Sequence, residues 1–330
     1  MSRRALLIGI NEYQCGQNLK SCVADTEELL LRLERHKDGA KNYDCVICPD
    51  QNSDGQKITR PVFRKLIRDL FDNFDGEIVL YFSGHGVLTE HGGYFCTFDA
   101  EADDWGVPMQ EVIDTANASA ASDVLLLLDC CHSGSIANPR LLQGKPNPLA
   151  VIRENMTVIA ASREMESAME GPEHGLFTAA LLDALDGGAA DHMGNVTAPA
   201  IYAYTERRFG AWDQRPIYKS HTHTVNTVRQ CEPLIDRLKL RKLVDYFPVA
   251  NFLYPLDPDY EPEDEHGNVR EPIDKEKVEI SALFKEYRDA GLLKPTVVGE
   301  QLFWTAKRSN TVELTARGRE YQWLVANGKI

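Results

Sequence analysis

Long apolar runs are missing from this sequence, and spanning a bilayer with a helix takes about 20 predominantly apolar residues. The apolar stretch near the start, residues 5–10, is short and stops at the polar Asn11. We interpret it as a buried first strand and not as a signal peptide. The sequence therefore predicts no membrane partner and a cytoplasmic location.

Basic charge is also scarce. The chain has 36 Lys and Arg side chains against 50 Asp and Glu, which gives a formal net charge of −14. A surface of this sign repels phosphate backbones and membranes rich in anionic lipid. The composition argues against a nucleic-acid partner and weakly favours encounter with basic polypeptides.

The eight cysteines do not form the pattern of a disulfide framework or of a structural zinc site. Cys45 and Cys48 make a CxxC pair, but they lie in a strand-like run where side chains three residues apart point to opposite faces. No second CxxC is present to complete a tetrahedral site. We predict that both side chains pack in the core and bind no metal.

What the sequence does contain is an alternation of strands and helices over its first two thirds. Two continuous apolar runs, residues 77–82 and 123–128, are typical of strands buried on both faces of a parallel sheet. The alternation predicts an α/β fold with a mostly parallel six-stranded sheet and helices on both faces. The predicted strands are residues 5–10, 43–48, 77–82, 123–128, 157–161 and 215–218, and the predicted helices are residues 25–35, 61–74, 176–185 and 197–208.

The character of the sequence changes after residue 228. Residues 229–272 are acidic and rich in proline, and we interpret them as a helical or extended connection. Residues 273–330 predict a winged-helix-like α+β module. Its expected elements are a helix at 275–290, a hairpin of 302–305 with 311–314, and a helix at 317–325.

A winged helix suggests DNA binding, but no basic stripe accompanies this module. We expect its large aromatic side chains to be core residues. The module is therefore predicted to be a regulatory or partner-docking domain that takes a protein activator. The aromatic residues are Phe303, Trp304, Tyr321 and Trp323.

Two loops carry residues with chemistry, and each follows one of the buried strands. Residues 83–86 read Ser-Gly-His-Gly, and residues 129–134 read Asp-Cys-Cys-His-Ser-Gly. Ligands of open α/β sheets bind where these loops lie, at the carboxyl ends of the strands. Thiolate attack needs a base that takes the thiol proton, and His85 is the candidate. The backbone N–H groups of Gly86 and Cys131 are candidates for binding the developing oxyanion.

Either motif alone would also fit a buried core histidine or a packed cysteine. Together, on neighbouring loops of one sheet, they favour catalysis. The pair Tyr-Phe-Ser-Gly-His-Gly and Asp-Cys-Cys-His-Ser-Gly resembles the catalytic signatures of the caspase-like cysteine peptidases, the metacaspase branch in particular. The resemblance spans roughly residues 1–228 and takes in residues 19–25, 160–162, 174–178 and 214–216, as in compact bacterial members.

This resemblance implies a caspase-like three-layer sandwich and a cysteine endopeptidase. It implies Cys131 as the nucleophile and His85 as the base, because metacaspases have Ser at the position of Cys130. Exchanged roles for Cys130 and Cys131 remain an alternative. The true-caspase pattern Gln-Ala-Cys-x-Gly is absent.

The resemblance also implies cleavage after Arg or Lys. Metacaspases form the S1 pocket, which holds the side chain before the cleaved bond, from positions that match Asp25, Ser83 and Asp129. Two carboxylates in a partly dry pocket demand a cation, and Arg satisfies both bidentately. Asp25 also fits an acid that interacts with the dipole of its own helix, and the two roles are compatible.

Calcium and self-cleavage are features of some metacaspases. Residues 136–153 match a region that the family often cuts during activation, so self-cleavage after Arg140 or Lys145 is a hypothesis. We expect no cofactor, with calcium left open, because four nearby acids do not match the family's calcium site and are interpreted as a surface loop. These acids are Asp99, Glu101, Asp103 and Asp104.

Bacterial caspase-like proteins often act in immunity or cell death, and the resemblance extends this expectation to the present chain. Two alternatives come from other classes of protein. A catalytically silent caspase-like scaffold would be marked by loss of His85 or Cys131, and both are present. A DNA-binding regulator acting through the C-terminal module would bind duplex in a salt-dependent way.

Overall fold

The computed structural model describes residues 2–130, 151–161, 174–209 and 215–330. The chain divides into two compact units, Met1–Glu232 and Pro233–Ile330, and each is described by itself. Within the described ranges, none of the helices has the length and apolar character needed to cross a bilayer.

The first unit is built on a six-stranded sheet in the order β10-β8-β7-β3-β1-β2. Neighbouring strands are parallel except at one edge, where β10 runs antiparallel to β8. The mostly parallel six-stranded sheet is therefore confirmed. Its strands are β1 (Arg3–Gly9), β2 (Asp44–Pro49), β3 (Glu77–Ser83), β7 (Asp123–Asp129), β8 (Met156–Ala160) and β10 (Ile217–His221).

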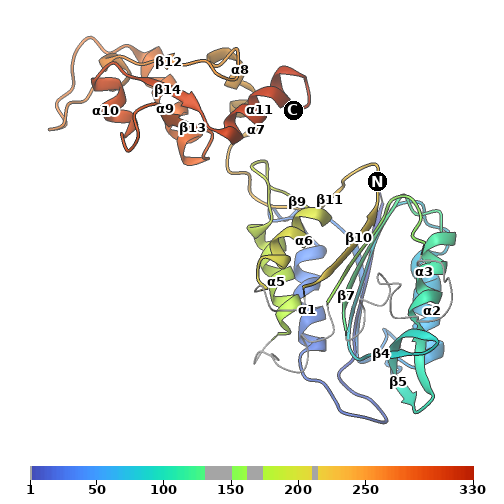
Figure 1. The fold of residues 1–330 in the computed structure, drawn as a ribbon. Coiled ribbons are helices and arrows are strands. Elements are labelled where there is room, and N and C mark those ends of the chain that lie inside the picture. The colour runs from blue at the N-terminus through green and yellow to red at the C-terminus, as the bar shows by residue number, and fades with distance from the viewer. Residues whose placement is uncertain (1, 131–150, 162–173, 210–214) are drawn as a thin grey trace. The chain divides into compact units, whose positions relative to one another are not determined.

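Helices cover both faces of this sheet, which makes three layers (Figure 1). One face carries α1 (Cys22–Leu33), α5 (Leu176–Asp183) and α6 (Ala198–Glu206). The other carries α2 (Arg60–Phe71) and α3 (Met109–Ala118). A short π-helix, η3 (Ala184–Gly188), continues α5.

Alternate residues of each central strand enter different layers, which explains the continuous apolar runs. In β3, Leu80 and Phe82 belong to the cluster under α2 and α3, whereas Val79 and Tyr81 belong to the cluster under α1, α5 and α6. The CxxC side chains divide in the same way, because Cys48 is in the first cluster and Cys45 packs against the second. The predicted core packing of this pair is confirmed.

A three-stranded antiparallel meander between β3 and α3 was not predicted. It consists of β4 (Gly86–Thr89), β5 (Gly92–Glu101) and β6 (Asp104–Pro108). Its tight turns contain Gly92 at φ +121° and Asp103 at φ +69°. The meander begins directly after His85, so it continues the histidine loop. A second unpredicted pair, β9 (Asn195–Thr197) and β11 (Thr227–Gln230), is antiparallel.

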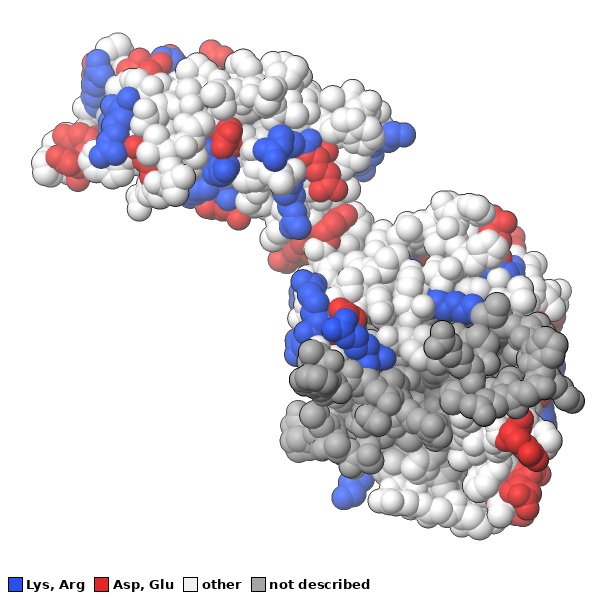
Figure 2. All heavy atoms as spheres, in the orientation of Figure 1, with Lys and Arg blue, Asp and Glu red and all other residues white. Residues whose placement is uncertain are grey.

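The second unit contains a small antiparallel sheet in the order β12-β14-β13. Figure 2 shows acidic and basic side chains interspersed on one face of this unit. The elements are α7 (Arg237–Arg241), α8 (Leu243–Tyr246), β12 (Tyr254–Pro255), η4 (Pro258–Tyr260), α9 (Lys275–Asp289), β13 (Leu293–Pro295), α10 (Leu302–Lys307), β14 (Thr311–Leu314) and α11 (Ala316–Ala326).

The predicted hairpin of residues 302–305 with 311–314 is wrong, because residues 302–305 begin helix α10. Phe, Trp and Thr favour strands by propensity. However, Leu302, Thr305 and Ala306 are buried, and their spacing places them on one face of a helix. β14 pairs with β13 instead, in antiparallel orientation.

Two further expectations for this unit need correction. Part of the supposed connection belongs to the folded unit, because β12 pairs with β14 and both Leu256 and Tyr260 are buried. The large aromatics are not all core residues either. Tyr321 is buried, but 37% of Trp304 and 56% of Trp323 are exposed.

Candidate active site

Two strands bring the sequence motifs to the same place. β3 and β7 are parallel neighbours, and their last residues, Ser83 and Asp129, are partners in the register. The backbone N–H of Gly84 donates to the carbonyl oxygen of Asp129 over 3.2 Å. The histidine loop and the cysteine loop therefore leave the carboxyl edge of the sheet from adjacent positions.

His85 is held at both its ring and its backbone. Ring atom Nε2 lies 2.7 Å from the carbonyl oxygen of Gln17. A carbonyl only accepts, so Nε2 is the donor in this contact, and in the neutral imidazole Nδ1 is then the acceptor. The backbone N–H of His85 donates to Tyr13 Oη over 2.7 Å, and its carbonyl accepts from the N–H of Cys96 over 3.0 Å. The arrangement leaves a partly exposed imidazole with a nitrogen able to accept a proton.

Tyr13 and Gly84 fit closely behind this imidazole. Tyr13 is buried, and its ring centroid lies 4.8 Å from that of His85. A Cβ atom at Gly84 would lie 2.7 Å from Tyr13 Oη, closer than real Cβ contacts come. The Ser-Gly-His sequence therefore needs glycine at its centre because the tyrosine occupies that space.

Asp25 lies in the first turn of α1 and is 1% exposed. Its Oδ2 accepts a hydrogen bond from Ser83 Oγ at 3.3 Å, and its Oδ1 lies 2.8 Å from His174 Nδ1. Burial and the nearby charge of Asp129 raise the pKa of Asp25 to about 7, although the contacts with His174 and Ser83 act in the opposite direction. Ionising this carboxyl is therefore costly in the empty pocket.

Asp129 ends β7 and is also buried. Its Oδ2 accepts from the hydroxyl of Thr178, and the backbone N–H of Thr178 donates to the same carboxylate. Burial raises the pKa of Asp129 to about 6 despite these two bonds. The hydroxyl of Thr178 also lies 2.7 Å from Tyr81 Oη, which is fully buried.

The structure thus brings together the three residues expected to form the S1 pocket, Asp25, Ser83 and Asp129, beside the loop of His85. Gly86 is buried and begins β4. The predicted nucleophile, Cys131, and the predicted cleavage positions, Arg140 and Lys145, lie outside the described residues.

Cys130 can be placed, and it is fully buried in the cluster under α2 and α3. Its side chain therefore enters the opposite layer from the acidic pocket, where Asp25 comes from α1 and Thr178 from α5. This burial fits a packing role for Cys130.

Sequence reasoning missed the partners of the two carboxylates. His174 and Thr178 belong to a stretch that contributed to the family resemblance, but neither received a role. Thr178 lies in the first turn of α5, whereas His174 precedes the helix, so helical spacing in the sequence did not mark the two as neighbours. We call the hydrogen-bonded group Asp25, Ser83, Asp129, His174 and Thr178 the acidic pocket, after the S1 pocket that the sequence predicts for three of its members.

The acids beyond the histidine loop have partners of another kind. Asp99 Oδ2 accepts from Arg60 Nε over 3.1 Å, and Asp104 forms an ion pair with the same guanidinium. These ion pairs connect the start of α2 to the meander. Over the described ranges, no group of three or more His, Cys, Asp or Glu side chains is placed to hold a metal ion.

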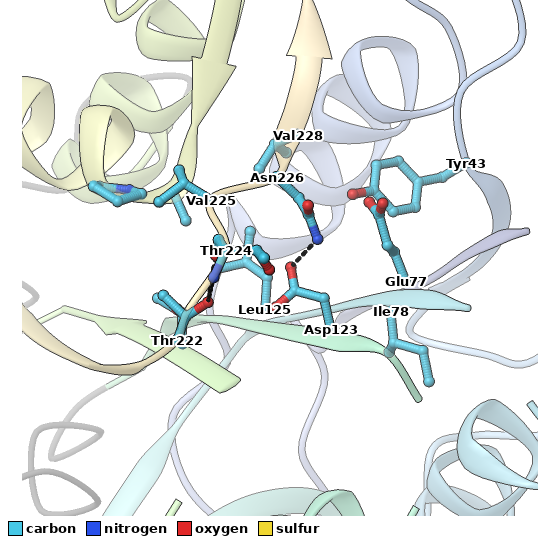
Figure 3. A pocket seen from close by; sticks show the side chains of 13 residues that line it. Tyr43, Glu77, Ile78, Asp123, Leu125, Thr222, Thr224, Val225, Asn226 and Val228 are labelled. Carbon is cyan, nitrogen blue, oxygen red and sulfur yellow. Dashed lines mark hydrogen bonds between the residues drawn. The ribbon is translucent and has the colours of Figure 1, made fainter. Parts of the chain in front are cut away.

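A second pocket lies at the opposite, amino-terminal edge of the sheet, and we call it the amino-edge pocket (Figure 3). Glu77 and Asp123, the first residues of β3 and β7, line it and are partners in the register. Glu77 forms an ion pair with Arg3 at 2.9 Å, and Asp123 accepts from Asn226 Nδ2 at 3.3 Å. Side chains of the protein itself therefore compensate these acids.

The fold and the site define an α/β protein of three layers with a histidine and two buried carboxylates at the carboxyl edge of its sheet. The family model described as "Caspase domain" matches residues 2–228. The chain therefore belongs to the caspase-domain family of cysteine peptidases, which confirms the resemblance drawn from the two motifs.

Similar curated proteins include Metacaspase-2 and Metacaspase-3 of Trypanosoma brucei brucei. Each is 27% identical over 147 residues, which are 40% of this chain. The matched part is 42% of Metacaspase-2 and 41% of Metacaspase-3, so it spans less than half of either relative.

Two solved structures are similar at low sequence identity. Protein GSU0716 from Geobacter sulfurreducens is 18% identical with a TM-score of 0.49, and the match covers 71% of this chain and 98% of that one. Caspase-1 from Spodoptera frugiperda is 12% identical with a TM-score of 0.48, and the match covers 69% and 90%.

Proposed function

We propose that this chain is a cysteine endopeptidase that cleaves after Arg or Lys, with Cys131 as nucleophile and His85 as base. The observation that carries the proposal is the acidic pocket beside the histidine loop. Within the described part of the chain, neither pocket carboxylate forms an ion pair with a Lys or Arg, and Asp25 Oδ1 lies 2.8 Å from His174 Nδ1. Two buried carboxylates without a Lys or Arg partner favour a cationic ligand.

The assignment of chemistry to His85 rests on Nδ1, which is the acceptor when the imidazole is neutral and Nε2 donates to Gln17, and on the position of its loop. The bond between Gly84 and Asp129 joins the histidine loop to the strand end that leads into the cysteine loop. From Asp129 the chain advances two residues to Cys131, and burial of Cys130 argues against the exchanged roles. An imidazole that accepts the thiol proton makes the nucleophilic thiolate. We assign the oxyanion contacts to the N–H groups of Gly86 and Cys131.

The test is cleavage of matched peptides that differ only in the residue before the scissile bond. Wild type is expected to cut the Arg peptide at least 100-fold faster than the Asp peptide in kcat/KM, with Lys between them. Cys131→Ala is expected to cut none, and Cys130→Ala to retain activity. Preference for Asp would overturn the specificity, and equal cleavage by wild type and Cys131→Ala would overturn the nucleophile.

Regulation of the peptidase is part of the proposal. We propose self-cleavage after Arg140 or Lys145, and a protein activator that acts through the C-terminal unit. Intact mobility of wild-type protein on a denaturing gel, during full activity on a peptide, would show that self-cleavage is not required. A silent scaffold remains the competing function, and it predicts no turnover of any peptide by wild type.

A further inference from the structure

His174 stands out because it contacts the acidic pocket yet has no role in the proposed chemistry. It precedes α5 by two residues, and 23% of its side chain is exposed. Its Nδ1 lies 2.8 Å from Asp25 Oδ1, and the residues are 149 positions apart in sequence. Such a contact exists only because α5 packs beside the first turn of α1.

The two pocket carboxylates are supported unequally. Asp129 receives two hydrogen bonds from Thr178, one from the hydroxyl and one from the backbone N–H. Asp25 receives one weak bond from Ser83 at 3.3 Å and the shorter contact from His174. His174 is therefore the principal group that favours the charged form of Asp25 against burial and the repulsion of Asp129.

We propose that His174 is a specificity-determining positioning residue, which holds Asp25 in its charged form and so keeps the pocket ready for a cationic side chain. The inference rests on the proposed preference for Arg and Lys. Each oxygen of Asp25 accepts one bond in the structure, and a carboxylate oxygen has capacity for a second. An entering guanidinium can therefore bind Asp25 while His174 and Ser83 remain in place.

The groups that face Asp25 determine the sign of the effect. Among the described residues they are Asp129 at the end of β7, Ser83 and Tyr81 on β3, and His174 before α5. Burial and Asp129 raise the pKa of Asp25, whereas His174 and Ser83 lower it. Loss of His174 would raise the pKa of Asp25 further. Asp25 would then be protonated at neutral pH, and the pocket would bind a cation less well.

Steady-state kinetics on an Arg peptide between pH 6 and pH 9 test this role with His174→Ala and His174→Gln. For His174→Ala we expect KM to rise about fivefold at pH 7 and to return to within twofold of wild type at pH 9, with kcat little changed. The amide of His174→Gln can still donate, so KM at pH 7 should recover in part. A rise by the same factor at every pH would indicate a merely structural role and overturn the proposal, as would no change.

A second measurement does not depend on turnover. In protein labelled with carbon-13 at the Asp carboxyl groups, Asp25→Asn assigns the Asp25 signal, and its titration midpoint is followed by NMR. His174→Ala should raise this midpoint by about one pH unit. An unchanged or lower midpoint would overturn the proposal, even if wild type cleaved nothing. Failure of wild type to cut after Arg or Lys would instead overturn the proposed function.

The matched control is His266→Ala in the C-terminal unit. His266 also has an acidic neighbour, because its Nε2 lies 3.7 Å from Glu265 Oε1, but 76% of its side chain is exposed. KM and the Asp25 midpoint should equal those of wild type. A change as large as that in His174→Ala would mean that the effect is not specific to the pocket, which would also overturn the proposal.

Discussion

Both edges of the central sheet hold a pair of acids, but only the amino-edge pair comes from corresponding positions of two neighbouring strands. At the amino edge, Glu77 and Asp123 are the first residues of β3 and β7, and at the carboxyl edge Ser83 and Asp129 are the last, with Asp25 added from α1. The amino edge supplies a guanidinium, Arg3, at 2.9 Å from Glu77. The carboxyl edge supplies hydroxyls and an imidazole.

The difference shows why burial of acids alone does not mark a site. Burial raises the pKa of Asp123 as well, but Asn226 hydrogen-bonds to that carboxylate and Arg153 lowers its pKa through its charge. The charge of one acid opposes ionisation of the other at both edges, but among the described residues only the amino edge has Arg side chains, Arg3 and Arg153, that counter it. An acidic pair compensated by the protein is structural, whereas a pair that the described residues leave without a Lys or Arg partner is able to select a ligand of opposite charge.

The largest effect should follow from removing an acid at the carboxyl edge. Asp129→Asn is expected to lower kcat/KM for an Arg peptide by at least 100-fold, because a charge-assisted bond to the substrate is lost. Alkylation of Cys131 by iodoacetamide should continue, since the thiol is untouched. Asp123→Asn is the matched change at the amino edge and should alter kcat/KM by less than twofold. Equal losses in both variants would break the comparison.

The next largest expected effect is the pH dependence of cation binding at the carboxyl edge. The raised pKa values of Asp129, about 6, and of Asp25, about 7, mean that both acids are protonated at pH 5 and ionised at pH 8. A cation should bind the ionised pocket more tightly, so the Ki of agmatine as a competitive inhibitor should fall about tenfold as pH rises through this range. A Ki that rises with pH would contradict the assignment.

Stability should change in the opposite sense. A carboxyl group whose pKa is higher in the folded chain than in the unfolded chain opposes folding when it ionises. The free energy of unfolding therefore falls as pH rises from the unfolded pKa to the folded pKa. The contribution of Asp25 to the free energy of unfolding should therefore fall between about pH 4 and pH 7, and Asp25→Asn should remove this contribution and gain on the order of 1 kcal/mol relative to wild type at pH 8. Urea unfolding monitored by circular dichroism at each pH measures this free energy. A steeper fall in Asp25→Asn would refute the idea.

A smaller effect is expected from Thr178→Val. This change removes the hydroxyl that contacts both Asp129 and Tyr81 but keeps the backbone bond. KM for an Arg peptide should rise about fivefold with kcat little changed, which corresponds to about 1 kcal/mol. Tyr81→Phe is the control, because it removes the other hydroxyl and leaves the bond to Asp129. A larger loss in Tyr81→Phe would show that the tyrosine, and not the threonine, supports the carboxylate.

The elements that the sequence predicts well are those whose neighbours impose a strong pattern. β3 and β7 are buried on both faces, so the residues between their polar ends, 78–82 and 124–128, form continuous runs of apolar and aromatic side chains. The meander β4–β6 lacks such a pattern, because most of β4 is only partly buried and its turns depend on single residues with positive φ. In α10, strand-favouring side chains adopt a helix because tertiary burial outweighs propensity.

The site divides in a similar way. Asp25, Ser83 and His85 were identified through motifs that are compact in sequence. His174 and Thr178 were not, because each acts on a carboxylate 149 or 49 residues away. Only the packing of α5 against the sheet creates those contacts, and local sequence does not encode them.

The bond from the N–H of Gly84 to the carbonyl of Asp129 joins the two functional loops through main-chain atoms. Amino-acid replacements other than proline leave such a bond available. The distance between the loops can therefore persist while sequences diverge. The acids that determine substrate specificity can then be replaced without a change in the relative position of the two loops. Evolution could in this way change what the scaffold cleaves more readily than how it cleaves.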